Sequence, residues 1–170
     1  LAAWAFSGLA AAQGVAPAAA ETALAEVKVS ASGLGQSGSE MTTPVSVLEG
    51  RELMLRREAT LGETLSGEPG IHSSHFGAGA SRPIIRGMDG PRVKILSDGA
   101  ELHDASSISP DHAVAMEPML ATQIEVLRGP SALIHGGGAM GGVVNILDNK
   151  IPTKIPEKGY EGSAELRYGS

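Results

Sequence analysis

The sequence predicts a small α+β domain with a mixed sheet. Short apolar runs bounded by glycine or proline recur along the chain, which is the pattern of buried strands. Helical segments with a start signal lie between the first of these runs. A corner with five glycines between His135 and Val143 separates the last two runs. Because glycine permits positive φ angles and close backbone approach, this corner is expected to be compact.

The predicted elements alternate between strand and helix at first and then become mainly strand. A strand at Val45–Leu48 follows Pro44 and leads into a helical segment around Arg51–Arg57. Thr60, with Glu63 three residues later, is a capping-box pattern that starts a short helix. This helix is expected to end at Gly67, Pro69 and Gly70. A hairpin-type turn is predicted at Asp98–Gly99, and one helical turn after Arg128-Gly129-Pro130. The further predicted strands are Ile71–Ser74, Pro83–Arg86, Val93–Ser97, Gln123–Leu127 and Val143–Leu147.

Composition limits the possible classes of protein. The 170 residues and 17.3 kDa leave room for one ordinary domain with terminal segments. A net charge of -6 and an aromatic content of 3% argue against nucleic-acid binding, which requires basic clusters and stacking side chains. The sequence has no cysteine, which excludes disulfides and thiolate metal sites.

The first twenty residues resemble the second half of a secretory signal peptide. Residues 1–12 are apolar and rich in alanine, and Ala18-Ala19-Ala20 forms a small-residue cleavage site before Glu21. The sequence starts without Met or a positively charged segment, so we expect it to be truncated there. A membrane anchor or a core helix is the alternative, but the run is shorter than the ~20 residues that a spanning helix needs. Export across the inner membrane is the expected consequence.

The segments that flank the predicted domain have different patterns. Residues 21–43 are rich in Ser, Gly, Ala and Thr, so they are expected to be mobile and to lack a core of their own. Within them, residues 25–30 alternate and are β-prone. An exposed strand of this kind can add to the edge of a partner's sheet, and an ordinary linker is the alternative.

The end of the chain predicts a linker and then a strand. Residues 150–159 contain Pro152 and Pro156 and are expected to be the linker. In residues 160–170, Ala164, Leu166 and Tyr168 alternate with polar residues, as in a transmembrane barrel strand with one lipid face. A single amphipathic strand of a soluble sheet has the same pattern.

Two glycine motifs imitate enzyme signatures but lack the remaining parts. Gly136-x-Gly138-x-x-Gly141 matches the dinucleotide fingerprint, which requires a helix directly afterwards. The residues that follow predict a strand instead, so no helix N-terminus would hold a pyrophosphate. The sequence His135-Gly-Gly-Gly resembles an esterase oxyanion loop, but the chain has no Gly-x-Ser-x-Gly nucleophile motif. We therefore expect no enzyme activity, no catalytic residues and no intrinsic cofactor.

Three segments in order, residues 44–71, 84–99 and 124–146, resemble the plug domain of TonB-dependent outer-membrane receptors. The resemblance covers about residues 26 to 150. It implies a plug inside a β-barrel of about 22 strands in the outer membrane of a Gram-negative bacterium. It also implies that Glu26, Val27, Lys28 and Val29 form the TonB box, which the energy-transducing protein TonB pulls. The glycine corner would then allow close seating within the barrel.

The same resemblance suggests a role for two arginines. Arg86 and Arg128 each end an apolar strand just before a glycine. In the family, arginines of these two motifs face glutamates of the barrel wall and lock the plug in place. Pairing with the plug's own acids, for example Glu125 or Asp98, is the open alternative, because a buried guanidinium requires a partner in either case.

The segment from His103 to His112 is the predicted ligand contact. It concentrates imidazole and carboxylate groups, which suit Zn²⁺ and similar ions. Asp111 and His112, after Ser-Pro, resemble the plug loop of the zinc-uptake branch, and His103 and Asp104 are further candidate ligands. The alternative is that Asp111 caps a helical turn near His112. His72 and His75 rank below these four as metal ligands, since loop histidines are commonly just solvated.

These observations predict one function with two rivals. We expect a signal peptide at 1–20, a TonB-box segment at 21–43, a plug at 44–149, a linker at 150–159 and a first barrel strand at 160–170. The plug would gate the uptake of scarce metal, either zinc or an iron chelate such as a siderophore or haem. Its partners would be TonB, its own barrel, the outer membrane and the metal or chelate. A stand-alone periplasmic metal-binding protein and a nucleotide-dependent enzyme are the alternatives.

Overall fold

The computed structural model describes residues 29–30, 45–151, 155–162 and 164–166. A mixed five-stranded sheet organises the fold, in the order β1-β6-β7-β4-β5. Its strands are β1 (Val45–Glu49), β4 (Val93–Ser97), β5 (Ala100–Glu101), β6 (Ala121–Leu127) and β7 (Gly142–Asp148). Strands β4 and β7 are parallel, whereas the other neighbours are antiparallel. The predicted α+β class with a mixed sheet is confirmed.

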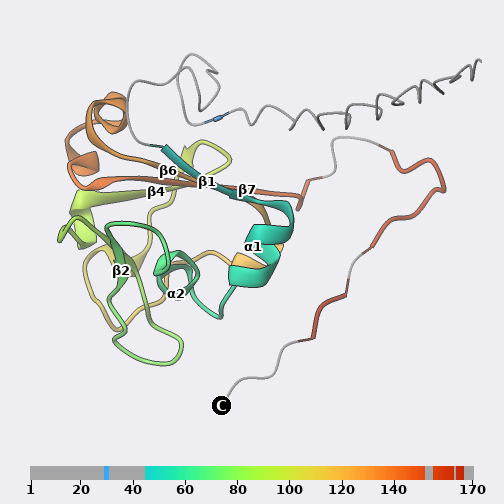
Figure 1. The fold of residues 1–170 in the computed structure, drawn as a ribbon, viewed down its shortest axis with the longest axis horizontal. Coiled ribbons are helices and arrows are strands. Elements are labelled where there is room, and N and C mark those ends of the chain that lie inside the picture. The colour runs from blue at the N-terminus through green and yellow to red at the C-terminus, as the bar shows by residue number, and fades with distance from the viewer. Residues whose placement is uncertain (1–28, 31–44, 152–154, 163, 167–170) are drawn as a thin grey trace, which may run out of the picture.

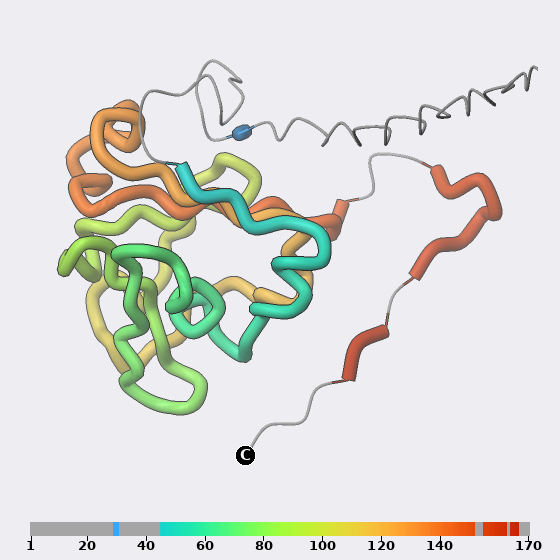
Figure 2. The backbone as a smooth tube through the Cα atoms, in the orientation of Figure 1, coloured from blue at the N-terminus to red at the C-terminus, as the bar shows by residue number. Residues whose placement is uncertain are grey.

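Figure 2 shows how the chain returns on itself to bring these strands together, although β1 and β6 are far apart in the sequence. A second sheet has two strands, β2 (Ile71–Ser73) and β3 (Pro83–Ile85). The helices are short: α1 (Gly50–Arg56), α2 (Leu61–Leu65), and the 3-10 segments η1 (Gly90–Arg92), η2 (Ala105–Ser107), η3 (Pro118–Leu120), η4 (Gly129–His135) and η5 (Gly137–Ala139). In the part of the chain that the structure describes, no helix has the length and apolar character needed to cross a bilayer.

The main sheet is covered on both faces, as its apolar strands predict. The helices α1 and α2 and the β2–β3 hairpin lie on one face, which contains the larger core. Segments η4 and η5 cover the other face, together with residues 29–30, which lie on that side of the sheet in Figure 1. Alternate residues of β6 and β7 contribute to the two cores, because strand side chains point to opposite faces in turn.

The start of α2 is half of the predicted capping box. Thr60 is the N-cap, and its side chain accepts a hydrogen bond from the Glu63 backbone N–H at 3.3 Å. The Glu63 side chain bonds His75 and Ser73 instead of returning to the cap. The helix start is therefore confirmed, whereas a tertiary contact redirects the second half of the motif.

The glycine corner packs against the domain's own residues. A Cβ on Gly141 would lie 2.8 Å from Met88 Cβ, and one on Gly142 would lie 2.8 Å from the Leu127 carbonyl oxygen. Gly142 also has a φ of +149°, and β7 begins there, so the predicted strand after the glycines is confirmed. Close packing inside the domain is thus sufficient to explain the corner, and seating within a barrel stays a prediction.

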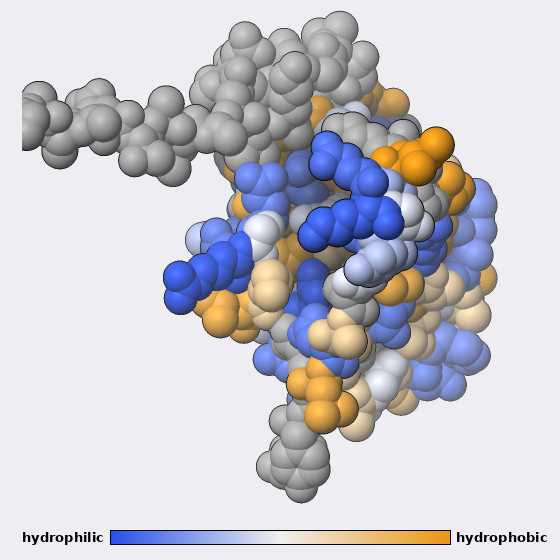
Figure 3. All heavy atoms as spheres, turned by 90° about the vertical axis from the view of Figure 1, so that its right-hand side faces the viewer, coloured by the Kyte–Doolittle hydropathy of each residue, from blue (hydrophilic) through white to orange (hydrophobic). Residues whose placement is uncertain are grey.

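Described residues near the C-terminal end form no strand. Residues 160–162 and 164–166 of the predicted barrel strand have no regular structure. A barrel strand takes its backbone hydrogen bonds from neighbouring strands, so an isolated one has no reason to become regular. Around α1 and this segment, Figure 3 shows hydrophilic surface interrupted by separate hydrophobic side chains. The exposed apolar residues include Met54, Leu55, Ile151, Ile155, Tyr160 and Leu166.

Candidate functional site: the loops joined by Arg82

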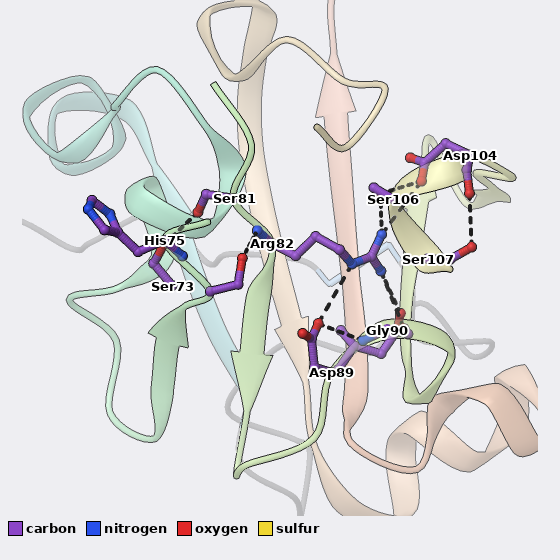
Figure 4. A network of polar contacts seen from close by, with 11 residues as sticks. Ser73, His75, Ser81, Arg82, Asp89, Gly90, Asp104, Ser106 and Ser107 are labelled. Atoms are coloured by element: carbon purple, nitrogen blue, oxygen red, sulfur yellow. Dashed lines mark hydrogen bonds and ion pairs between the residues drawn. The ribbon is translucent and has the colours of Figure 1, made fainter. Parts of the chain in front are cut away.

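A buried arginine joins the loops on the α2 side of the main sheet. Arg82 directly precedes β3 and is only 3% exposed. Its guanidinium donates a hydrogen bond to the Ser106 hydroxyl and lies 3.5 Å from Asp104 Oδ1 (Figure 4). It also donates to the carbonyl oxygens of Gly90 and Val93, both at 3.4 Å. One side chain thus connects β3, η1 and the loop that contains η2.

Asp104 organises the loop on its side of this network. One carboxylate oxygen accepts a hydrogen bond from the Ser106 hydroxyl, and the other accepts one from the Ala115 backbone N–H at 2.9 Å. Burial raises the pKa of Asp104, but these hydrogen bonds and the charge of Arg82 together lower the pKa below its ordinary value. Burial lowers the pKa of Arg82, and Asp104 and Asp89 act in the opposite direction. The paired charges therefore hold residues 103–117 against the start of β3.

A second polar cluster lies in the loop between β2 and β3. His75 Nδ1 is 2.8 Å from Glu63 Oε1, and Ser73 donates to the same oxygen at 2.7 Å. These contacts lower the pKa of Glu63, the hydrogen bond from His75 having the largest effect. His75 is otherwise exposed, with a side-chain exposure of 79%, and has a positive φ of 45°. Its Nε2 is the nitrogen that remains available to a ligand.

The two loops share a cavity of about 540 Å³. Gly79 and Ser81 line it from the β2–β3 loop, and residues 113–117 line it from the other loop. Thr60 and Leu61 at the start of α2 form part of the same wall. A ligand that contacts one loop can therefore contact the other.

The predicted metal residues do not form one cluster. Asp111 and His112 are exposed neighbours, with His112 Nδ1 2.9 Å from Asp111 Oδ1, and the chain makes turns there, so the alternative helical turn capped by Asp111 is absent. Asp104 instead faces Arg82, and His103 is exposed beside a separate cavity that Lys94 and Glu101 also line. Hydrogen bonds from Ser109 and then from His112 lower the pKa of Asp111. Among the described residues, no group of three His, Asp or Glu side chains is placed to hold a metal ion. The metal role of these four residues stays a prediction.

The two predicted lock arginines meet at one turn but differ in their surroundings. Arg128 is 7% exposed and donates to the Pro69 carbonyl oxygen at 3.0 Å and to the Ser46 hydroxyl. Its other neighbour is Glu68, at 3.9 Å. Burial lowers the pKa of Arg128. An acid of the same domain, Glu68, therefore lies near Arg128, whereas Glu125, one of the two acids named as examples, points to the opposite face of the sheet.

Arg86 is exposed at the tip of a tight turn. Its φ of 50° and that of Gly87, 76°, form the turn that follows β3, so the strand ends at Ile85, one residue earlier than predicted. The Arg86 backbone N–H donates to the Gly70 carbonyl oxygen at 2.9 Å. Within the residues that the structure describes, its guanidinium makes no hydrogen bond or ion pair.

Only one residue of the predicted TonB box is described. Glu26, Val27 and Lys28 lie outside the described residues, as does the predicted signal peptide at 1–20. Val29 is fully buried and belongs to the core on the η4 side of the sheet. This differs from an exposed strand in a segment without a core, because the main sheet supplies an apolar surface for Val29.

The sequence did not indicate Arg82 as a functional residue. A charged residue between Ser81 and Pro83, at the start of an apolar strand, was the available signal. The hydrogen-bond acceptors of its guanidinium lie 8 to 24 residues further along the chain, so no local spacing reveals them.

Comparison with known proteins gives the family of this domain. Residues 37–143 match the family described as the TonB-dependent Receptor Plug Domain, and the chain belongs to this family. A curated relative, the Hemin receptor of Yersinia pestis, is 31% identical over 117 residues, which are 68% of this chain and 17% of the relative.

Solved structures give the same result. The ferric enterobactin receptor PfeA of Pseudomonas aeruginosa, a mutant in complex with enterobactin, is similar with a TM-score of 0.51 and 27% identity, over 61% of this chain and 17% of that chain. The siderophore receptor PirA of Acinetobacter baumannii is similar with a TM-score of 0.50 and 28% identity, over 63% and 17%. The chain thus spans less than a fifth of the length of these relatives.

Proposed function

We propose that this chain is the plug, or gate, of an outer-membrane receptor that imports an iron chelate, a siderophore or haem, with energy supplied through TonB. The plug-family match over residues 37–143 carries this proposal. Relatives that are named as receptors for hemin, ferric enterobactin and siderophore support the class of substrate. In this proposal the plug is a conformational switch: a ligand contacts the two loops joined by Arg82, and a pull on residues 26–29 rearranges the domain.

Exposed apolar side chains support an enclosing barrel. Soluble monomers rarely expose large contiguous apolar patches without a binding role, whereas single exposed apolar side chains are ordinary. In this chain Leu133 and Ile134 of η4 and Met140 after η5 are 60%, 64% and 61% exposed, and Ile108 is 90% exposed. A surrounding barrel would cover such residues.

Haem is the iron chelate that best fits the β2–β3 loop. Haem iron is often bound by a histidine, and ligating histidines usually donate their other ring N–H to a carboxylate. His75 has this arrangement, since Glu63 Oε1 lies 2.8 Å from Nδ1 and the lowered pKa of Glu63 favours an acceptor. The side chain of Phe76, 59% exposed, offers an apolar surface beside it. We propose His75, which the sequence analysis ranked below the other candidate metal residues, as a plug ligand of haem iron.

Zinc has weaker support. Asp111 and His112 supply two donors, whereas zinc sites usually have four ligands. Two or more ligands would have to come from outside the described residues. Zinc therefore remains the competing outcome of the experiment.

Uptake by the complete receptor tests the proposal. Cells that depend on this receptor would be supplied with haemin, a ferric catecholate siderophore or zinc as separate nutrients, with and without TonB. We expect TonB-dependent uptake of an iron chelate; uptake of zinc alone would overturn the proposal. For haemin, His75→Ala should weaken binding at least tenfold, whereas His72→Ala serves as the matched control. Unchanged haemin binding in His75→Ala would remove the role of His75 and leave the class of receptor untouched.

Arg86 is the stronger candidate for the lock between plug and barrel. Its guanidinium is exposed, whereas Arg128 already bonds Pro69 and Ser46. We expect Arg86→Ala to raise the passive leak of large solutes through the complete receptor. Arg51→Ala, an exposed arginine on α1, is the control. Equal leak in the two variants would argue against the lock.

The outer segments complete the proposal. A signal peptide at 1–20 would export the chain, and the linker at 150–159 would lead to a first barrel strand at 160–170. The reading frame after Ser170 should then encode alternating segments of about 10 residues, each ended by a turn.

A further inference from the structure

One ion pair connects the domain to the chain that follows it. Arg57, the C-cap residue of α1, places one guanidinium nitrogen 2.9 Å from Glu165 Oε2. Its other terminal nitrogen donates to the carbonyl oxygen of Ala121, the first residue of β6, at 2.7 Å. Glu165 lies beyond the residues that match the plug family, which end at 143. The contact therefore joins α1 and β6 to a segment outside the matched domain.

The domain by itself leaves the charge of Arg57 without a counter-ion. The Arg57 side chain is only 10% exposed, so its guanidinium has lost most of its hydration. A buried guanidinium is costly unless a carboxylate pairs with it. Among the described residues, Glu165 is the carboxylate that forms this pair, whereas the Ala121 carbonyl is neutral. This site on the plug is thus complete only when the C-terminal segment is attached to it.

The exposure of the C-terminal side chains differs between odd and even positions. The Glu165 side chain is 31% exposed and contacts the domain. Tyr160 and Leu166, at even positions, are 79% and 98% exposed. In a barrel strand, side chains alternate between the lumen and the lipid. Attachment through Glu165 would turn the odd-numbered polar side chains to the lumen and leave the even-numbered apolar ones for the lipid.

We propose that Arg57 is the site on the plug that receives residues 160–170, and that its ion pair with Glu165 fixes which face of this segment lies against the plug. The proposal rests on the proposed function, in which these residues are the first barrel strand. The contact is separate from the predicted lock, because Arg57 bonds the start of β6, whereas Arg128 follows the other end of that strand. Arg57 then acts as a positioning residue for the first part of the barrel wall.

Cross-linking in the complete receptor tests which face of the strand meets the plug. The 170 residues contain no cysteine, so pairs can be introduced once any other cysteine of the receptor has been replaced by serine. Arg57→Cys would be combined with Glu165→Cys or with Leu166→Cys and treated with a short bis-maleimide in outer membranes. We expect the pair with Glu165→Cys to cross-link at least about tenfold faster, because successive strand side chains point to opposite faces. Equal rates for the two pairs would overturn the assigned face.

Charge reversal tests the ion pair itself. Glu165→Arg places a second cation beside Arg57, and position 165 belongs to neither core, so the plug should still fold. Glu161→Arg, four residues earlier on the same predicted face, is the matched control. The readout is hydrogen exchange of the Arg57 amide, whose N–H donates to the Leu53 carbonyl oxygen at 2.9 Å and closes the end of α1.

We expect Glu165→Arg to accelerate this exchange at least about fivefold and Glu161→Arg by less than about twofold. Adding Arg57→Glu to Glu165→Arg restores opposite charges and should return the exchange to within about threefold of the parent. Equal exchange in Glu165→Arg and Glu161→Arg, or a double variant that exchanges no more slowly than Glu165→Arg, would overturn the ion pair. Neither measurement uses a substrate, so these results are separate from an uptake experiment in which the proposed function itself fails.

Discussion

Replacing Arg82 by methionine tests whether the buried network holds the 103–117 loop. Methionine keeps much of the volume and removes the charge, which leaves the Asp104 carboxylate without its cationic neighbour. The two charged groups are 3.5 Å apart and their side chains are 3% and 8% exposed. At an effective dielectric constant of about 20, the attraction over this distance is about 5 kcal/mol. Breaking a buried pair in this way typically costs about 3–5 kcal/mol.

Hydrogen exchange in the complete receptor measures this cost where it arises. The Ala115 N–H bonds Asp104, so its exchange reports the opening of the loop. A loss of about 3 kcal/mol corresponds to roughly hundredfold faster exchange. Exchange within β6 serves as the internal reference and should change far less.

A double variant separates the charge pair from a general loss of packing. Asp104→Asn alone leaves Arg82 without its nearest carboxylate, whereas the double variant removes both charges. We expect the Ala115 amide of the double variant to exchange at least tenfold more slowly than the product of the two single effects would give. Additive effects, or unchanged exchange of residues 103–117 in Arg82→Met, would refute the role of the pair.

Three further outcomes are expected in the complete receptor. Gly141→Ala should lower the free energy of unfolding of the plug in urea by about 1–3 kcal/mol, because its Cβ would lie 2.8 Å from Met88 Cβ. Gly137→Ala, where a Cβ would meet open space, should change this free energy by less than about 0.5 kcal/mol. Equal effects of the two substitutions would contradict the packing argument. Thr60→Ala should cost about 1 kcal/mol in the same assay through loss of the N-cap, and no loss would argue against the cap. Because the folded pKa of Asp104 is lowered, its stabilising effect is full above the ordinary carboxyl pKa and is lost as the pH falls through the folded value. At pH values below about 4, the protection of the loop amides from hydrogen exchange, corrected for the intrinsic exchange rate, should therefore decrease. The decrease should be smaller in Asp104→Asn.

The strands could be predicted because their signals are local. Apolar runs between glycines and prolines located β4, β6 and β7, and the Thr60 cap located α2. The short strand β5 was not predicted, since its two exposed residues become a strand only through pairing with β4. The segments η2 and η3 lie in loops whose sequence has no helical periodicity.

The candidate site was only partly predictable, because its contacts join distant residues. The loop with Asp104 was indicated by its concentration of polar groups, but the direction of that carboxylate depends on Arg82. Side chains on one strand point alternately to opposite faces, so the sequence places Glu125 and Arg128 on different faces without indicating what each one meets. Arg128 meets the turn at Pro69, and Glu125 meets Ser30, 95 residues away.

The sequence by itself determined all the strands but β5, the N-cap of α2, the glycine corner and the family resemblance, because each depends on residue types at short spacing. Tertiary structure decided the order of the strands, the buried Arg82 network and the attachment of Val29 and Ser30 to the sheet. These features depend on which distant backbone donors and carboxyl groups meet once the apolar faces are buried. Local propensity cannot predict such long-range contacts, because a polar group needs a partner only once the folded sheet has buried it.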